Sequence, residues 1–174
     1  MSNKKFEEFL NRQTENADSK SIDWDKKRAN WIRELASFYG AIESFIKPYI
    51  EAGKIKMTYG KKKIFEEHLG EYEAKNAIIF FGSNQVKLEP IGTNLIGVEG
   101  RVDLIGANGK VKFFLVNNAT KAQKVSVCEQ PPLPEENGFE ENGAWKIATN
   151  PPNLIYFDLE QDSFFDALME VANG

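Results

Sequence analysis

The chain has 174 residues, of which 41% are hydrophobic and 28% are charged, a composition typical of soluble globular proteins. This composition excludes collagen-like chains, coiled-coil rods and wholly disordered chains. With 22 basic and 26 acidic residues the formal net charge is −4, so we do not expect nucleic acid as a partner. A chain of this length is expected to fold as one domain whose core needs no metal or disulfide.

The first residues and the apolar runs argue against export and membrane insertion. Glu7 and Glu8 stand where a signal peptide needs its apolar centre. The longest apolar run, residues 77–81, falls far short of the roughly 20 residues that cross a bilayer. Cys128 is the single cysteine, so neither an intramolecular disulfide nor a four-cysteine zinc site can form. These features predict a cytoplasmic protein that does not contact a membrane.

A long helix is predicted within residues 21–52. Apolar side chains recur there at three- and four-residue steps, as in an amphipathic helix, at Trp31, Leu35, Phe38, Ile42, Phe45 and Tyr49. Residues 1–20 are predicted to be a separate N-terminal segment that is partly flexible or forms a short helix at about residues 4–14.

Both ends of the long helix carry local signals. Ser21 or Asp23 can act as the N-cap, because each side chain can accept from the first free backbone N–H groups. Pro48 lacks an N–H donor and restricts the residue before it, so we expect a kink or a fresh short turn there. Gly53 is expected to close the helical segment.

From Gly53 onward the hydrophobic period changes to two residues, which predicts mainly β structure over residues 53–158. Residues 60–62 are predicted to form a turn. The predicted extended runs are 54–59, 63–68, 72–81, 84–89, 98–107, 110–117, 123–128, 144–149 and 154–158. Between them, residues 129–143 form an acidic, proline-containing loop with five glutamates and no basic residue.

A final helix is predicted over residues 162–172, where apolar side chains again recur at helical spacing. Residues 21–174 are therefore predicted to form a single α+β domain. It consists of a long N-terminal helix, a predominantly antiparallel, curved sheet of about six to eight strands, and a C-terminal capping helix. The sheet is expected to be a meander with a barrel-like outline.

One hairpin has a specific local signal. The Asn-Gly pair at residues 108–109, between alternating runs, predicts a two-residue turn that joins antiparallel strands. Counting back from that turn places Asp103 opposite Phe114 and Arg101 opposite Val116. The opposite face of the same hairpin, with Val98, Val102, Leu104, Phe113 and Leu115, is predicted to form the main core.

Charged residues on the second face of this hairpin are the predicted ligand site. There, Arg101 and Asp103 lie among apolar neighbours, which implies partial cover by a helix, a partner or a ligand. A structural Arg–Asp pair under the long helix explains the same pattern. The candidate ligand-binding residues are Glu99, Arg101, Asp103, Phe114 and His68.

His68 is the only histidine, so any histidine-based proton transfer must use it. Glu66 and Glu67 precede it and would favour its protonated form. The alternative is an exposed histidine in a turn or at a strand end. Neither a phosphate-binding loop, a nucleophile elbow nor a metal-binding motif occurs, so we predict no catalytic residues, no metal and no cofactor.

The apolar stripe of the long helix is wide enough to pack on more than one surface. Trp31, Phe38 and Tyr39 are therefore candidate partner-binding residues, and a homodimer is one arrangement that would use them. Packing on the sheet and on a second helix of the same chain explains the stripe as well. The proline run at residues 131–134 could also dock on a partner, and the lysines at residues 61–63 could touch phosphate.

Taken together, these patterns favour a non-catalytic cytoplasmic binding or regulatory module that acts through protein–protein contacts, with a protein partner whose identity is unknown. The alternative is a small-molecule-binding domain or small enzyme with a pocket between sheet and helices around Arg101 and Asp103. In that case Arg101 would hold an anionic group, and Asp103, Glu99 or His68 would transfer protons.

Overall fold

The computed structural model describes residues 4–11, 23–93, 98–117, 143–149 and 155–172. Residues 4–11 are helical, and the two further helices are α2 (Trp24–Glu51) and α3 (Gln161–Ala172). The described residues form seven strands, which are β1 (Ile55–Glu66), β2 (Gly70–Phe81), β3 (Asn84–Gly92), β4 (Gly100–Gly106), β5 (Gly109–Asn117), β6 (Gly143–Ala148) and β7 (Tyr156–Asp158).

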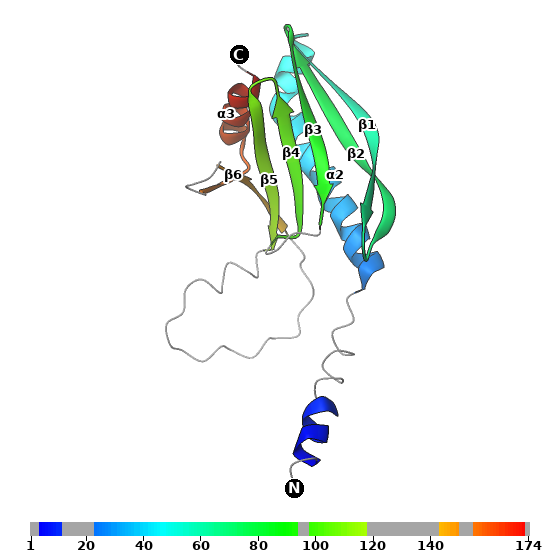
Figure 1. Ribbon diagram of the computed structural model, residues 1–174. Coiled ribbons are helices and arrows are strands. Elements are labelled where there is room, and N and C mark those ends of the chain that lie inside the picture. The colour runs from blue at the N-terminus through cyan, green and yellow to red at the C-terminus, as the bar shows by residue number, and fades with distance from the viewer. Residues whose placement is uncertain (1–3, 12–22, 94–97, 118–142, 150–154, 173–174) are drawn as a thin grey trace.

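The strands form one antiparallel meander in which each strand pairs with the next along the chain. The predicted α+β fold is confirmed, but the sheet is open, with β1 and β7 at its edges, and does not close into a barrel. Both helices lie on the same side of the sheet (Figure 1). Phe113 of β5 touches both of them, with its ring centroid 5.4 Å from that of Phe38 and 6.4 Å from that of Phe164.

The N-cap and the C-terminus of α2 follow the sequence signals. Asp23 is the N-cap, and its carboxylate accepts from the backbone N–H of Lys26 at 3.1 Å. After the helix, Gly53 has φ of 70°, and its N–H donates to Ile50 while that of Lys54 donates to Tyr49. This pair of bonds is a Schellman motif, which satisfies two of the last carbonyls.

The fresh short turn expected at Pro48 does not form, because α2 continues through this residue to Glu51 as one helix. Pro48 lies within the last turn, so little of the helix follows the one hydrogen bond that its missing N–H removes. Its own carbonyl still accepts from the N–H of Ala52 at 3.1 Å. The proline therefore costs one donor near a terminus and does not break the element.

The turn predicted at residues 60–62 is wrong. The strand β1 runs through these residues without a break and pairs with β2 from Ile55 to Glu66, and the turn lies at residues 67–69. Gly60 pairs with Asn76, and a Cβ added to the glycine would lie only 2.6 Å from the side-chain oxygen of Asn76. This glycine allows the two strands to approach closely, and a glycine at such a position looks the same in the sequence as a glycine in a turn.

The β4–β5 hairpin is confirmed with a different register. Its loop is residues 107–108, so Arg101 lies opposite Phe114 and Asp103 lies opposite Lys112. The predicted register is therefore off by two residues, which leaves every side chain on its predicted face because the side-chain period is two. A tertiary contact accounts for the difference: the N–H of Asn108 donates to the carbonyl of Val171 in α3 at 2.9 Å.

The last two predicted strands and the final helix are confirmed. The predicted runs at 144–149 and 154–158 correspond to β6 and β7, and the final helix corresponds to α3. The predicted strand at 123–128 and nearly all of the acidic loop lie outside the described residues, and so does most of the segment 1–20.

The core lies between the sheet and the two helices. Trp31, Phe38 and Tyr39 of α2 are 1%, 0% and 2% exposed. Burial of each large apolar side chain contributes roughly 2 kcal/mol. The wide stripe of α2 is explained by a second helix, because its Phe45 also contacts Phe164 of α3, at 6.2 Å between ring centroids.

Both ends of β4 are glycines that lie directly beneath a helix. A Cβ on Gly100 would lie 2.2 Å from the ring of Trp31 in α2, and a Cβ on Gly106 would lie 2.3 Å from the carbonyl oxygen of Val171 in α3. Separations this short exclude any side chain at either position without movement of the helix. The sequence of β4 thus fixes how closely both helices approach the sheet.

We predict that Gly100→Ala lowers the free energy of unfolding by about 1–3 kcal/mol, because the new methyl group overlaps Trp31. The matched control is Gly40→Ala in α2, where an added Cβ meets no atom within 4 Å. That change is expected to stabilise by about 0.5–1 kcal/mol, since alanine favours a helix interior. Chemical denaturation of both variants measures the difference, and equal stability for the two would contradict the close approach.

Candidate functional site

Polar and aromatic side chains gather on the sheet face that points away from both helices. We call this surface the open face. It is defined by Lys87, Glu89, Arg101, Asp103, Lys110, Lys112, Phe114, Lys146, Tyr156 and Asp158, which the strand pairing places on one side. Among the described residues, no helix or strand packs over it (Figure 1).

The centre of the open face is an ion pair within β4. Arg101 donates to both carboxylate oxygens of Asp103, from Nε at 2.6 Å and from Nη2 at 2.7 Å. The Asp103 side chain is 3% exposed and that of Arg101 is 19% exposed. This two-point geometry fixes the guanidinium plane, and charge-assisted bonds of this kind are among the strong ones in proteins.

A second group of charges lies beside that pair. Glu89 is opposite Asp103 in the neighbouring strand and accepts from Lys87 at 3.4 Å. Lys62 of β1 reaches the same carboxylate at 3.0 Å. Partial burial raises the pKa of Glu89, but the hydrogen bonds and charges of the two lysines outweigh it, so the pKa lies below its usual value of 4.5.

Aromatic rings border these charges towards the β7 edge. The ring of Phe114 meets that of Tyr156 edge to face, with 6.2 Å between centroids. Lys146 donates to Asp158 next to them. Tyr156 is 51% exposed, so a large amphipathic ring is available at this edge. Exposed aromatic and arginine side chains are the types enriched where proteins bind each other.

The open face differs in charge from the whole chain. Its ten residues include five basic and three acidic side chains, a net charge of +2, whereas the chain carries −4. Much of this charge is already paired within the face, by the contacts of Asp103, Glu89 and Asp158. The face is therefore a mildly basic surface with a fixed pattern of charges.

The predicted ligand residues are only partly brought together. Arg101, Asp103 and Phe114 share the open face. Glu99 precedes β4 and is exposed, and its backbone N–H donates to Leu115 at 2.8 Å. His68 is exposed in the turn after β1 and stacks on Trp24 at the start of α2, at 4.6 Å between rings.

The predicted partner residues lie elsewhere again. Trp31, Phe38 and Tyr39 face the interior, where Tyr39 donates from its hydroxyl to the carbonyl of Lys75 at 2.7 Å. Burial raises the pKa of this hydroxyl. In the described fold these three side chains form the core of the chain itself, which is the alternative that the width of the stripe left open.

The structure also contains a buried polar cluster that sequence analysis missed. Glu66 is 8% exposed, and its carboxylate accepts from the hydroxyl of Tyr72 at 2.5 Å and from both the N–H and the hydroxyl of Thr93. Burial, the hydrogen bond from Tyr72 and the charge of Glu66 together raise the tyrosine pKa. The only sequence signal was Gly92, where a Cβ would lie 2.9 Å from that carboxylate.

This cluster joins distant strands and leaves little free space. The cavity beside it has a volume of about 40 Å³ and is bordered by Trp24, Lys27 and His68. That volume accommodates water molecules and no organic ligand. Since the carboxylate is fully engaged by donors, the cluster fits a structural role that ties β1 and β2 to the residue after β3.

Several further properties bear on function. In the ranges that the structure describes, His, Cys, Asp and Glu residues do not gather in groups of three that could hold a metal ion. Among the described helices, none combines the length and the apolar composition needed to cross a bilayer. Comparison of the chain with protein-family models, curated proteins and solved structures gives no match.

We predict that Arg101→Ala lowers the free energy of unfolding by about 3 kcal/mol, because it leaves the buried Asp103 carboxylate without its two-point partner. The matched control is Lys110→Ala, whose ammonium lies 3.8 Å from the same carboxylate on a side chain that is 53% exposed. Its loss is expected to cost about 0.5 kcal/mol or less. Similar losses for both variants in urea titrations would show that the geometry of the arginine is unimportant.

Proposed function

We propose that this protein is a non-catalytic, cytoplasmic binding module that uses the open face to bind another protein. The observation that carries the proposal is the asymmetry of the sheet. Both helices cover one side, while the other side holds an array of charges and rings over which no described helix packs. An array of this kind offers shape, charge and aromatic area without further ordering, which lowers the entropic cost of binding.

The state of the charged groups supports binding over proton transfer. A general base needs a free lone pair aimed at the proton it removes. Both oxygens of Asp103 instead accept from Arg101, and Glu89 accepts from two lysines. These carboxylates orient the cations that they bind, which are Arg101, Lys62 and Lys87.

The chemistry of the face suggests the kind of partner. Lys110 and Lys112 lie beside Asp103 at its centre, and Phe114 and Tyr156 provide aromatic area at one side. An acidic protein surface with an apolar centre would complement this arrangement. A second copy of the chain that paired this face with itself would bring like charges together, which disfavours a homodimer formed in this way.

Site-specific photo-crosslinking tests the proposal. A photoreactive phenylalanine analogue replaces Tyr156 on the open face or, as the matched control, Tyr49 on α2. Tyr156 is 51% exposed and Tyr49 is 40% exposed. Both variants are expressed in the native host, irradiated and analysed by mass spectrometry.

With the analogue at Tyr156 we expect one crosslinked adduct of constant mass, in which the crosslinked peptides are acidic and come from a single partner protein. With the analogue at Tyr49 we expect no adduct. An adduct of twice the chain mass would identify the partner as a second copy of this chain in place of a different protein. Adducts only from Tyr49, or none from either position, would overturn the assignment of the open face as the binding surface.

A further inference from the structure

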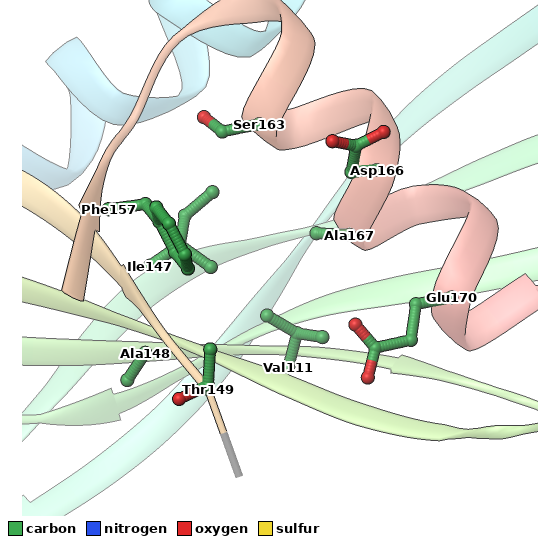
Figure 2. Close-up of a pocket in the computed structure, with 9 residues that line it drawn as sticks. All are labelled: Val111, Ile147, Ala148, Thr149, Phe157, Ser163, Asp166, Ala167 and Glu170. Carbon is green, nitrogen blue, oxygen red and sulfur yellow. The ribbon is translucent and has the colours of Figure 1, made fainter. Parts of the chain in front are cut away.

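A groove of about 240 Å³ lies on the other side of the sheet, between α3 and the strands β5 to β7 (Figure 2). Its floor is apolar and comes from Val111, Ile147 and Phe157. Its wall is the face of α3 that carries Asp166, Ala167 and Glu170. None of the predicted ligand residues lines it, so it is separate from the open face and independent of the proposed function.

Two carboxylates stand above this apolar floor. Asp166 and Glu170 are four residues apart on α3, which puts them on one side of the helix. Both residues line the groove (Figure 2), and both are exposed. Among the described residues, no lysine or arginine lies within ion-pair distance of either carboxylate.

This arrangement of negative charge is unfavourable for the protein on its own. Like charges at this spacing destabilise a helix by a few tenths of a kcal/mol. Glu170 also lies in the last turn of α3, where the helix dipole is negative and basic residues are absent. A cation bound in the groove would relieve both effects, so the negative potential and the empty apolar space favour the same class of ligand.

We propose that the groove binds a cationic group carried on an aliphatic stem, namely an alkylguanidinium or alkylammonium. The cation lies between Asp166 and Glu170, and the stem packs on Val111 and Ile147. The ring of Phe157 at the end of the floor can also contact a guanidinium face. The volume is below the roughly 300 Å³ at which drug-sized pockets begin, which fits one side chain or one small amine.

This chemistry has two sources, a free small molecule with an alkylguanidinium or alkylammonium group, or an arginine or lysine side chain of another protein. We therefore use two probes, n-butylguanidinium and the capped tripeptide Gly-Arg-Gly, and two controls. The first control, n-butylurea, keeps the shape of butylguanidinium without its charge. The second, guanidinium ion, keeps the charge without the stem.

Binding is followed by chemical shifts of the amide signals of Ala167 and Ile147 in the intact chain. We expect saturable shifts with butylguanidinium or the arginine peptide, at least tenfold weaker binding of guanidinium ion, and no saturation with butylurea. Stronger binding of the peptide would identify a protein source, and stronger binding of butylguanidinium would identify a free small-molecule cation. Equal binding of butylurea, or no saturation with either cationic probe, would overturn the proposal.

A pair of variants tests the two carboxylates directly. The double variant Asp166→Asn, Glu170→Gln is expected to weaken binding at least tenfold. It is expected to remain folded, because both side chains are exposed and their mutual repulsion is removed. The matched control is Glu160→Gln, an exposed acid just before α3 that does not line the groove. Unchanged affinity in the double variant, or an equal loss in the control, would show that the carboxylates do not hold the cation.

Discussion

The close approach of two helices to one strand is the constraint on which the rest of the structure depends. Gly100 and Gly106, at the two ends of β4, leave room for Trp31 of α2 and for the backbone of α3 at Val171. Phe113 in the next strand then contacts both helices. Because side chains in a strand alternate between faces, the residues between those that face the helices point to the opposite side of the sheet. The helices also meet each other, through Phe45 and Phe164, so the width of the α2 stripe is used within the chain.

The open face is a consequence of that one-sided packing. Asp103 is buried on this side of the sheet although no described helix lies above it, and Arg101 and Lys110 compensate its charge. A buried pair of this kind contributes little net stability compared with apolar residues of the same size, but it fixes geometry. The groove beside α3 has the opposite character, with two acids that no lysine or arginine of the described residues pairs, next to apolar side chains. The two surfaces therefore differ in the sign of their charge and lie on opposite sides of the sheet.

Local patterns predicted much of this fold, and tertiary contacts account for the rest. Alternation along β4 and β5 predicted which face holds Val102 and which holds Arg101, because the period of two is a local property. The hairpin register was wrong because Asn108 is held by the end of α3, which lies more than 60 residues away in the chain. For the same reason the sequence did not predict the Glu66 cluster, since Thr93 lies 27 residues from that carboxylate. The groove also escaped prediction, because Val111 and Asp166 become neighbours only when α3 packs on the sheet.

The most direct test of the account is the accessibility of methyl groups on the two faces of the sheet. In a methyl-labelled sample, a soluble gadolinium chelate broadens NMR signals according to their distance from solvent. Ile78 and Ile105 lie on the side of the open face, whereas Leu88 and Leu104 are 0% exposed beneath the helices. We predict broadening of the two isoleucine signals and protection of the two leucine signals. Equal protection of all four would mean that the supposedly open side is covered as well, and would contradict the central claim.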